Sequence, residues 1–204
     1  SGHSRPDIAF AVHQCARYTF NPTRRHELAL IRIGRYLKGT INKGLIMTPS
    51  SVPRVDCYPD ADFAGLYGYA EITCSEVVKS RTGFLITVCQ CPMVWVSKLQ
   101  TETALSTMEA EIIALAHCCW ELFPVCDTVK EIGKVVGIET EKMSTMHVSI
   151  HEDNAGALVF AETIPPEFMP RSKYYAIKMV WFREEIQKHG IKSIKIDTVE
   201  QLGD

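Results

Sequence analysis

Two stretches of helical periodicity open the chain. Apolar residues recur on one face from Pro6, a residue suited to the first turn of a helix, to about Phe20. A second apolar stripe follows Asn21-Pro22 and ends at Gly39, a residue that favours helix ends. Two amphipathic helices cannot bury their apolar faces alone, so we expect them to pack on each other or on a partner surface.

From residue 50 onward the pattern predicts strands alternating with helices. Strand-like runs occupy 55–58, 82–88 and 93–96, with a turn at 90–92, and a long helix runs from Thr107 to the mid-130s. A strand at 146–150, helices at 155–161 and 172–188 and a strand at 192–196 follow, and EQLGD at the end suggests one more helical turn. A meander followed by crossovers predicts a mixed five-stranded sheet with helices on its faces.

Composition sets broad limits. The 204 residues, 46% hydrophobic and 23% charged, are typical of a globular protein with one core of good size. No uninterrupted run of about 18 apolar residues occurs, so no membrane span is expected, and the first ten residues lack a signal-peptide core. The eight cysteines form no Cys-x-x-Cys pair, which favours reduced, buried thiols of an intracellular protein over a zinc site.

The net charge of −2 hides an uneven distribution. Residues 1–49 carry eight Lys/Arg against two acids, residues 50–165 seven against sixteen, and residues 166–196 seven against three. Basic flanks around an acidic middle suit a protein that grips a polyanion and holds metal ions between the flanks. Solvated helix faces would produce the same distribution.

Acidic residues gather where predicted strands end or the long helix begins. They are Asp60 and Asp62 after the first strand, Glu109 and Glu111 in the helix, Glu152 and Asp153 after the fourth strand, and Asp204 after the fifth. Any single acid is more readily a cap or a loop residue, but clustered carboxylates repel one another unless divalent cations lie between them. Oxygen ligands suit Mg²⁺ or Mn²⁺, and two ions about 4 Å apart would activate water for attack on a phosphodiester.

Nine stretches carry a more specific signal: SRPDIAFAV, RYLKGT, DCYPDADFAG, KSRTGF, WVSKLQ, ALSTMEAEIIAL, EDNAGAL, PRSKYYAIKMVWFRE and DTVEQLGD. In this order the chain resembles the C-terminal part of a copia-type LTR-retrotransposon polyprotein, in which the end of the reverse transcriptase precedes its RNase H domain. The resemblance implies a thumb- or connection-like helical segment at 1–49 and an RNase H-like α/β domain at 50–204. The polymerase site is absent, because YPDAD has an alanine where a Tyr-x-Asp-Asp motif needs its second aspartate.

The resemblance also implies the site. Asp60, Glu111, Asp153 and Asp204 would be the catalytic metal ligands, holding two Mg²⁺ ions with Mn²⁺ as a substitute. The family's helix glutamate stands in a Glu-x-x-Ala pattern, which fits Glu111 and Ala114.

Two neighbouring acids are rivals for these roles. Glu109 does not fit the Glu-x-x-Ala pattern, and Ser106 three residues before it suggests a capping box. We prefer Asp60 to Asp62 because Asp60 directly follows the predicted strand, and Asp62 stays an alternative.

Other residues are candidates for weaker roles. The histidine that related enzymes carry after the fifth strand, where it helps product release, is missing from residues 197–203. Basic candidates for contacts with nucleic acid are Lys79, Arg81, Lys98, Arg171 and Lys173, and a solvated surface position suits the first three equally well. The three tryptophans, Trp95, Trp120 and Trp181, are interpreted as core residues in preference to base-stacking platforms.

The leading hypothesis is a ribonuclease H that cuts the RNA strand of RNA–DNA hybrids by a two-metal-ion mechanism during retrotransposon reverse transcription. It would select the hybrid by its shape and 2′-hydroxyls, work beside the polymerase domain of the same polyprotein, and reside in the cytoplasm in a virus-like particle. A non-catalytic nucleic-acid-binding or scaffolding module is the alternative, against which the four carboxylates argue. A transposase or integrase nuclease usually has its acids in the order Asp, Asp, Glu, unlike this chain.

Overall fold

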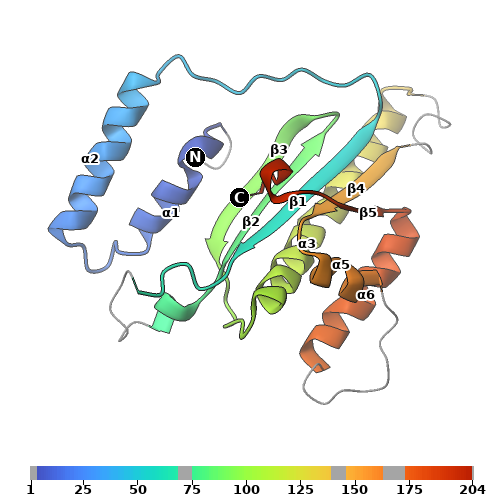
Figure 1. The fold of residues 1–204 in the computed structure, drawn as a ribbon. Helices are drawn as coiled ribbons and strands as arrows, with labels where there is room; N and C mark the ends of the chain where they lie inside the picture. The colour runs from blue at the N-terminus through green and yellow to red at the C-terminus, as the bar shows by residue number, and fades with distance from the viewer. Residues whose placement is uncertain (1–3, 69–74, 139–145, 163–172, 204) are drawn as a thin grey trace.

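The structure, a computed structural model, describes residues 4–68, 75–138, 146–162 and 173–203. A five-stranded sheet forms its centre (Figure 1), in the order β3-β2-β1-β4-β5. The strands are β1 Arg54–Asp62, β2 Arg81–Val88, β3 Cys91–Leu99, β4 His147–Glu152 and β5 Lys192–Lys195. The first three form an antiparallel meander, whereas β4 pairs parallel with β1 and β5 parallel with β4. The predicted mixed five-stranded sheet is confirmed.

One face of the sheet carries the main hydrophobic core. Helix α3 (Thr107–Val135) packs against β1 and β2 on this face, and α5 (Ala155–Glu162) and α6 (Lys173–His189) pack beside it. Val55 and Cys57 of β1 alternate inward, as do Phe84 and Ile86 of β2, and all four are fully or almost fully buried against α3. Alternation on the strands and a long apolar helix therefore build one continuous core.

Helix α3 is also, of the described segments, the one long and apolar enough to cross a membrane by length and composition. Within that apolar window 44% of the residues are buried in the protein. Leu115, Cys118 and Leu122 pack on the sheet, so α3 is the core helix of this fold.

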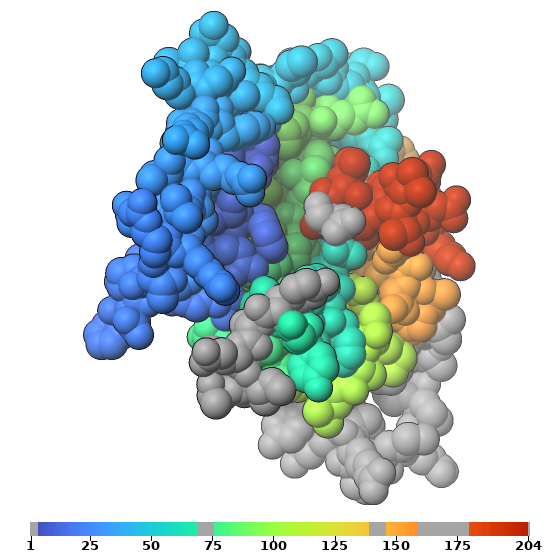
Figure 2. Space-filling model, turned by 60° about the vertical axis from the view of Figure 1, so that its left-hand side comes forward, coloured from blue at the N-terminus to red at the C-terminus, as the bar shows by residue number. Residues whose placement is uncertain are grey.

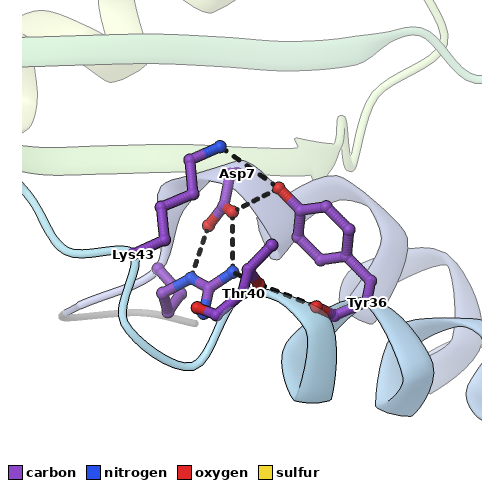
Figure 3. A network of polar contacts seen from close by, with 5 residues as sticks. Asp7, Tyr36, Thr40 and Lys43 are labelled. Carbon is purple, nitrogen blue, oxygen red and sulfur yellow. Dashed lines mark hydrogen bonds and ion pairs between the residues drawn. The ribbon is translucent and has the colours of Figure 1, made fainter.

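The N-terminal segment forms two helices that pack on each other. These are α1 (Ala9–Ala16), entered through a 3-10 turn at Pro6–Ile8, and α2 (Arg24–Gly39). A polar network ties their ends together (Figure 3): Tyr36 Oη donates to Asp7 Oδ2 at 2.8 Å, and Arg5 bridges Asp7 and Thr40. Helix α1 also contacts β3, whereas the outer side chains of α2 stay exposed. The expected mutual packing of the two helices is thus confirmed.

The second face of the sheet is partly covered by two segments far apart in the chain (Figures 1 and 2). Helix α1 lies over β3, and residues after the 3-10 turn Thr198–Glu200 lie over β1 and β2. Gln201 Nε2 donates to Pro59 O at 2.7 Å, and a Cβ at Gly83 would clash with the carbonyl oxygen of Gly203. The glycine at position 83 therefore permits the close approach of the C-terminal segment. The helical turn expected at EQLGD is wrong, because the turn ends at Glu200 and Gln201–Gly203 run non-helically.

Three strand boundaries differ from the prediction. Strand β1 continues to Asp62, so Asp60 lies inside it; Pro59 is tolerated there because β4 pairs with β1 only as far as Cys57. Strand β4 likewise runs to Glu152. The β2–β3 turn lies at Cys89 and Gln90, whose φ angles are 50° and 68°, and not at 90–92. Two successive positive φ angles match a tight hairpin turn.

The cysteines and tryptophans give a mixed result. Seven of the eight cysteines lie in the described residues and all seven are free thiols, five of them buried. Trp181 packs against the core, but Trp120 is 67% exposed. The core interpretation is therefore wrong for Trp120, which follows buried Cys118 and Cys119 on α3 and whose ring centre lies 6.0 Å from that of Trp181. The eighth cysteine, Cys74, lies outside the described residues.

Candidate active site

Three of the four predicted metal ligands come together at one end of the sheet. Asp60 projects from β1, Glu111 from the second turn of α3, and Asp153 from the residue directly after β4. One carboxylate oxygen from each lies within 4.8 Å of the other two. Asp204 lies outside the described residues, so its predicted place beside them stays a prediction.

Small residues allow this convergence. Ala110 and Ala114 of α3 are fully buried and pack with Ala61 of β1. Their short side chains let the first turns of the helix lie close to the strand. Glu111, between the two alanines, is therefore held against the sheet with only 5% of its surface exposed.

Glu109 has the separate role that the capping pattern indicates. Ser106 is the N-cap of α3, and its Oγ accepts a hydrogen bond from the Glu109 backbone N–H at 3.1 Å. The Glu109 carboxylate accepts from the backbone N–H of Leu105 at 3.0 Å, one residue before the expected position. Glu109 therefore caps α3, whereas Glu111 belongs to the carboxylate cluster.

Burial and mutual repulsion dominate the electrostatics of the site. Burial, then the negative charges of Glu152, Asp60 and Asp153, raise the pKa of Glu111 to about 9, against a smaller lowering by a hydrogen bond from the Ala61 backbone. Without a cation beside it, the Glu111 carboxyl group would hold its proton at neutral pH.

Glu152 is a fourth acid that sequence reasoning passed over in favour of Asp153. It is fully buried, and its Oε1 accepts from the Asn154 backbone N–H at 3.1 Å. Burial above all raises its pKa to about 8. The available signal was that β4 extends to residue 152, which turns the Glu152 side chain inward while Asp153 lies in the following loop.

The donor set fits a hard divalent cation. All three clustered ligands are carboxylates, which Mg²⁺ and Mn²⁺ prefer. Among the described residues, Glu111 Oε2 and Glu152 Oε2 are buried without a hydrogen-bond partner. Buried acceptor atoms left without a donor are costly in a folded protein, and a bound cation would relieve that cost at Glu111.

The basic candidates are dispersed. Lys79 is half-buried before β2 and Lys98 is exposed on β3. Arg81 is only 6% exposed under α1, so the solvated-surface alternative does not hold for it. Arg171 lies outside the described residues, as does the side chain of Lys173 at the start of α6.

The strand order and the acids borne by β1, α3 and the end of β4 define an RNase H-like domain. Its homologues are retrovirus-related Pol polyproteins of transposons, and the chain belongs with them. That from transposon RE1 of Arabidopsis thaliana is 30% identical and that from transposon TNT 1-94 of Nicotiana tabacum 32% identical, each over 201 residues. The matches cover 98% of this chain, which spans only 12% and 14% of those polyproteins. No protein-family model matches the chain.

Solved structures similar to the chain include LC11-RNase H1, isolated from compost. The superposition has a TM-score of 0.45 and 16% identity, and covers 72% of this chain and 87% of the other. The same enzyme in complex with an RNA/DNA hybrid is similar at a TM-score of 0.45.

Proposed function

We propose that this chain is a ribonuclease H that hydrolyses the RNA strand of RNA–DNA hybrids during retrotransposon reverse transcription. The convergence of Asp60, Glu111 and Asp153, with a buried unpartnered oxygen on Glu111, carries the proposal. Homology to Pol polyproteins over almost the whole chain supports the retroelement context. A polymerase domain in the same polyprotein and a virus-like particle in the cytoplasm are parts of the proposal that rest on this homology alone.

The three acids would hold the divalent cations, together with Asp204 if it joins them. Bound Mg²⁺ supplies Lewis acidity and charge neutralisation for attack on a phosphodiester. The protein's contribution is to orient the ligands: Glu111 is held by the packing of α3 on β1, and Asp60 by the pairing of β1 with β2, in which it lies opposite Gly83. Burial keeps bulk water away from Glu111 and strengthens its interaction with a cation.

A cleavage assay on a labelled RNA–DNA hybrid with Mg²⁺ tests the proposal, with duplex DNA and duplex RNA as substrate controls. Asp60→Asn, Glu111→Gln and Asp153→Asn should each lower the rate by about a hundredfold or more, which corresponds to several kcal/mol of lost charge stabilisation. EDTA should stop the reaction. Cleavage of duplex DNA in preference to the hybrid would favour a transposase-type nuclease instead.

Matched variants keep the test specific. Glu109→Gln and Asp62→Asn remove the same charge from acids that neighbour Glu111 and Asp60 in the sequence but are not members of the cluster, so they should retain most of the activity. Hybrid binding without cleavage by the folded wild-type protein would support the non-catalytic module. Full activity of Glu111→Gln would contradict the assignment of the site.

A further inference from the structure

Gln100 joins the start of helix α3 to the sheet. It directly follows β3, its backbone N–H donates to Ser80 O at 2.9 Å, and the residue is only 5% exposed. Its side-chain Nε2 donates to Ala110 O at 2.9 Å and to Thr82 Oγ1 at 3.1 Å. Because a carbonyl oxygen can only accept, the contact with Ala110 fixes which end of the amide group is the nitrogen. Gln100 therefore donates both of its amide protons, one to α3 and one to β2.

These two hydrogen bonds reach Glu111 from two sides. Ala110 directly precedes Glu111 in α3. Thr82 lies opposite Ala61 in the β1–β2 ladder, and the Ala61 backbone hydrogen-bonds to the Glu111 carboxylate. Asp60 belongs to the next pair along the same ladder. The backbone before Glu111 and its carboxylate are thus both tied to the ladder pair beside Asp60.

Burial makes this connection stiff. Thr82 is 1% exposed and Ala110 is completely buried, so water does not compete for either hydrogen bond, and such bonds are stronger in the protein interior. Among the residues that the structure describes, the buried Oε1 of Gln100 has no hydrogen-bond partner. An apolar side chain of the same size would avoid the cost of that atom. What only the amide supplies here is the pair of donated hydrogen bonds.

We propose that Gln100 is a positioning residue for the carboxylate cluster. By holding the Ala110 carbonyl group beside Thr82, it fixes how Glu111 lies relative to Asp60, without touching an ion or the substrate itself. Partners that orient metal ligands from behind are worth about 10- to 100-fold in metal affinity or activity. That the cluster serves phosphodiester cleavage rests on the proposed ribonuclease function, whereas the contacts of Gln100 do not.

Gln100→Met tests this role, because methionine has a similar volume and no side-chain donor. Calorimetric titration with Mn²⁺ should show an affinity about tenfold or more below that of the wild-type protein. In hybrid cleavage with Mg²⁺, kcat should fall about tenfold or more. The KM for the hybrid should change less than about twofold, because Gln100 does not contact the substrate.

A second readout needs neither metal nor activity. In EDTA, the backbone N–H of Ala61 is protected from hydrogen exchange by its hydrogen bond to Glu111. If Gln100→Met lets Glu111 move away from β1, NMR should show this amide exchanging about tenfold faster than in the wild-type protein.

Control variants separate positioning from stability. Val55→Ala removes completely buried side-chain volume near the start of β1, far along the strand from Asp60, so it should lower the Tm and leave the Mn²⁺ affinity within about twofold. Thr82→Val removes only the hydroxyl group that accepts from Gln100, and it covers the case in which Gln100→Met fails to fold. Thr82→Val should lower the Mn²⁺ affinity, whereas Thr82→Ser, which keeps the hydroxyl group, should restore it to within about twofold of wild type.

Two results would overturn the proposal. The first is wild-type Mn²⁺ affinity in folded Gln100→Met, or in Thr82→Val if the former does not fold. The second is an equal loss of affinity in Val55→Ala, which would show that the affinity follows global stability. If the wild-type protein binds Mn²⁺ but does not cleave hybrids, the ribonuclease function alone is contradicted. If it does not bind Mn²⁺, the exchange of the Ala61 amide decides the role of Gln100, and unchanged exchange in the variant refutes it.

Discussion

Asp60 and Glu111 belong to elements separated in the chain by strands β2 and β3, yet their carboxylate oxygens lie within 4.8 Å. Glu111 is 5% exposed and is pressed against β1 by two buried alanines on its own helix. Glu111 therefore affects both the stability of the metal-free protein and the proposed metal-dependent cleavage.

Glu111→Gln should stabilise the metal-free protein at alkaline pH. The pKa of Glu111 rises from 4.5 to about 9 on folding, so the folded state favours the protonated acid. That stability is fully present below the unfolded value and is lost as the pH rises towards about 9. When the pH is raised from 5 to 8 in EDTA, the Tm of Glu111→Gln should fall less than the Tm of the wild-type protein. For a chain of this size, 1 kcal/mol shifts the Tm by about 2–4 °C. An equal fall of the Tm in the two proteins would contradict the burial of the Glu111 carboxyl group.

Ser106→Ala should weaken the start of α3 without removing the chemistry. Loss of the N-cap hydrogen bond to Glu109 costs about 1 kcal/mol. Denaturant unfolding should register this cost, while hybrid cleavage below the melting range stays within about twofold of wild type. If Ser106→Ala instead eliminated activity in a folded protein, the division between a capping Glu109 and a site Glu111 would fail.

Gly83→Ala should displace the C-terminal segment. A Cβ at this position would clash with the backbone oxygen of Gly203, and a clash of this kind costs about 1–3 kcal/mol. Limited proteolysis should cut Gln201–Gly203 faster in the variant. Gly34→Ala is the control, because nothing lies within 4 Å of its added Cβ on α2, and helix propensity favours it by about 0.5–1 kcal/mol. Equal protection of the C-terminal segment in Gly83→Ala and wild type would show that the segment does not rest on β2.

Asp56→Asn should destabilise the second face of the sheet. Asp56 is 2% exposed and accepts hydrogen bonds from His151 Nε2 at 2.9 Å and from Arg54 Nη2 at 2.6 Å. Removing one partner of a buried ion pair costs about 3–5 kcal/mol. The exposed Asp127→Asn should cost less than about 0.5 kcal/mol.

The difference in stability between the wild-type protein and Asp56→Asn should depend on pH. Burial alone would raise the pKa of Asp56, but the hydrogen bonds from His151 and Arg54 lower it on balance below 3.8. Its stability contribution is therefore present above that value and is lost as the pH falls further. Urea unfolding from about pH 5 to about pH 3 should show the gap between wild type and Asp56→Asn narrowing. A constant gap would indicate that the carboxylate charge does not contribute.

Local patterns in the sequence were sufficient to identify most elements. Period-two runs marked the three strands of the meander, and the Ser106 cap and the apolar run after it marked α3. They failed where a boundary depends on a neighbouring strand: β1 runs through Pro59 to Asp62 because β2 pairs with it along its whole length. The β2–β3 turn lies one position earlier than expected, since Cys89 and Gln90 adopt positive φ without a glycine.

Burial of individual polar residues could not be read from the sequence. Arg81 and Glu152 lie at the ends of strands, where polar side chains are usually exposed. Helix α1 covers Arg81, however, and the core encloses Glu152. Trp120, in contrast, is exposed although its neighbours on α3 are buried.

The sequence by itself determined the order of the elements, the sheet class and the candidate acids, because periodicity and capping are local properties of the chain. The resemblance had already separated Glu111 from the capping Glu109, but only the tertiary structure decided that the oxygens of Glu111, Asp60 and Asp153 meet, and that Glu152 and Arg81 are buried. Such choices depend on distances between side chains from different elements, and those distances exist only once the sheet and α3 are packed.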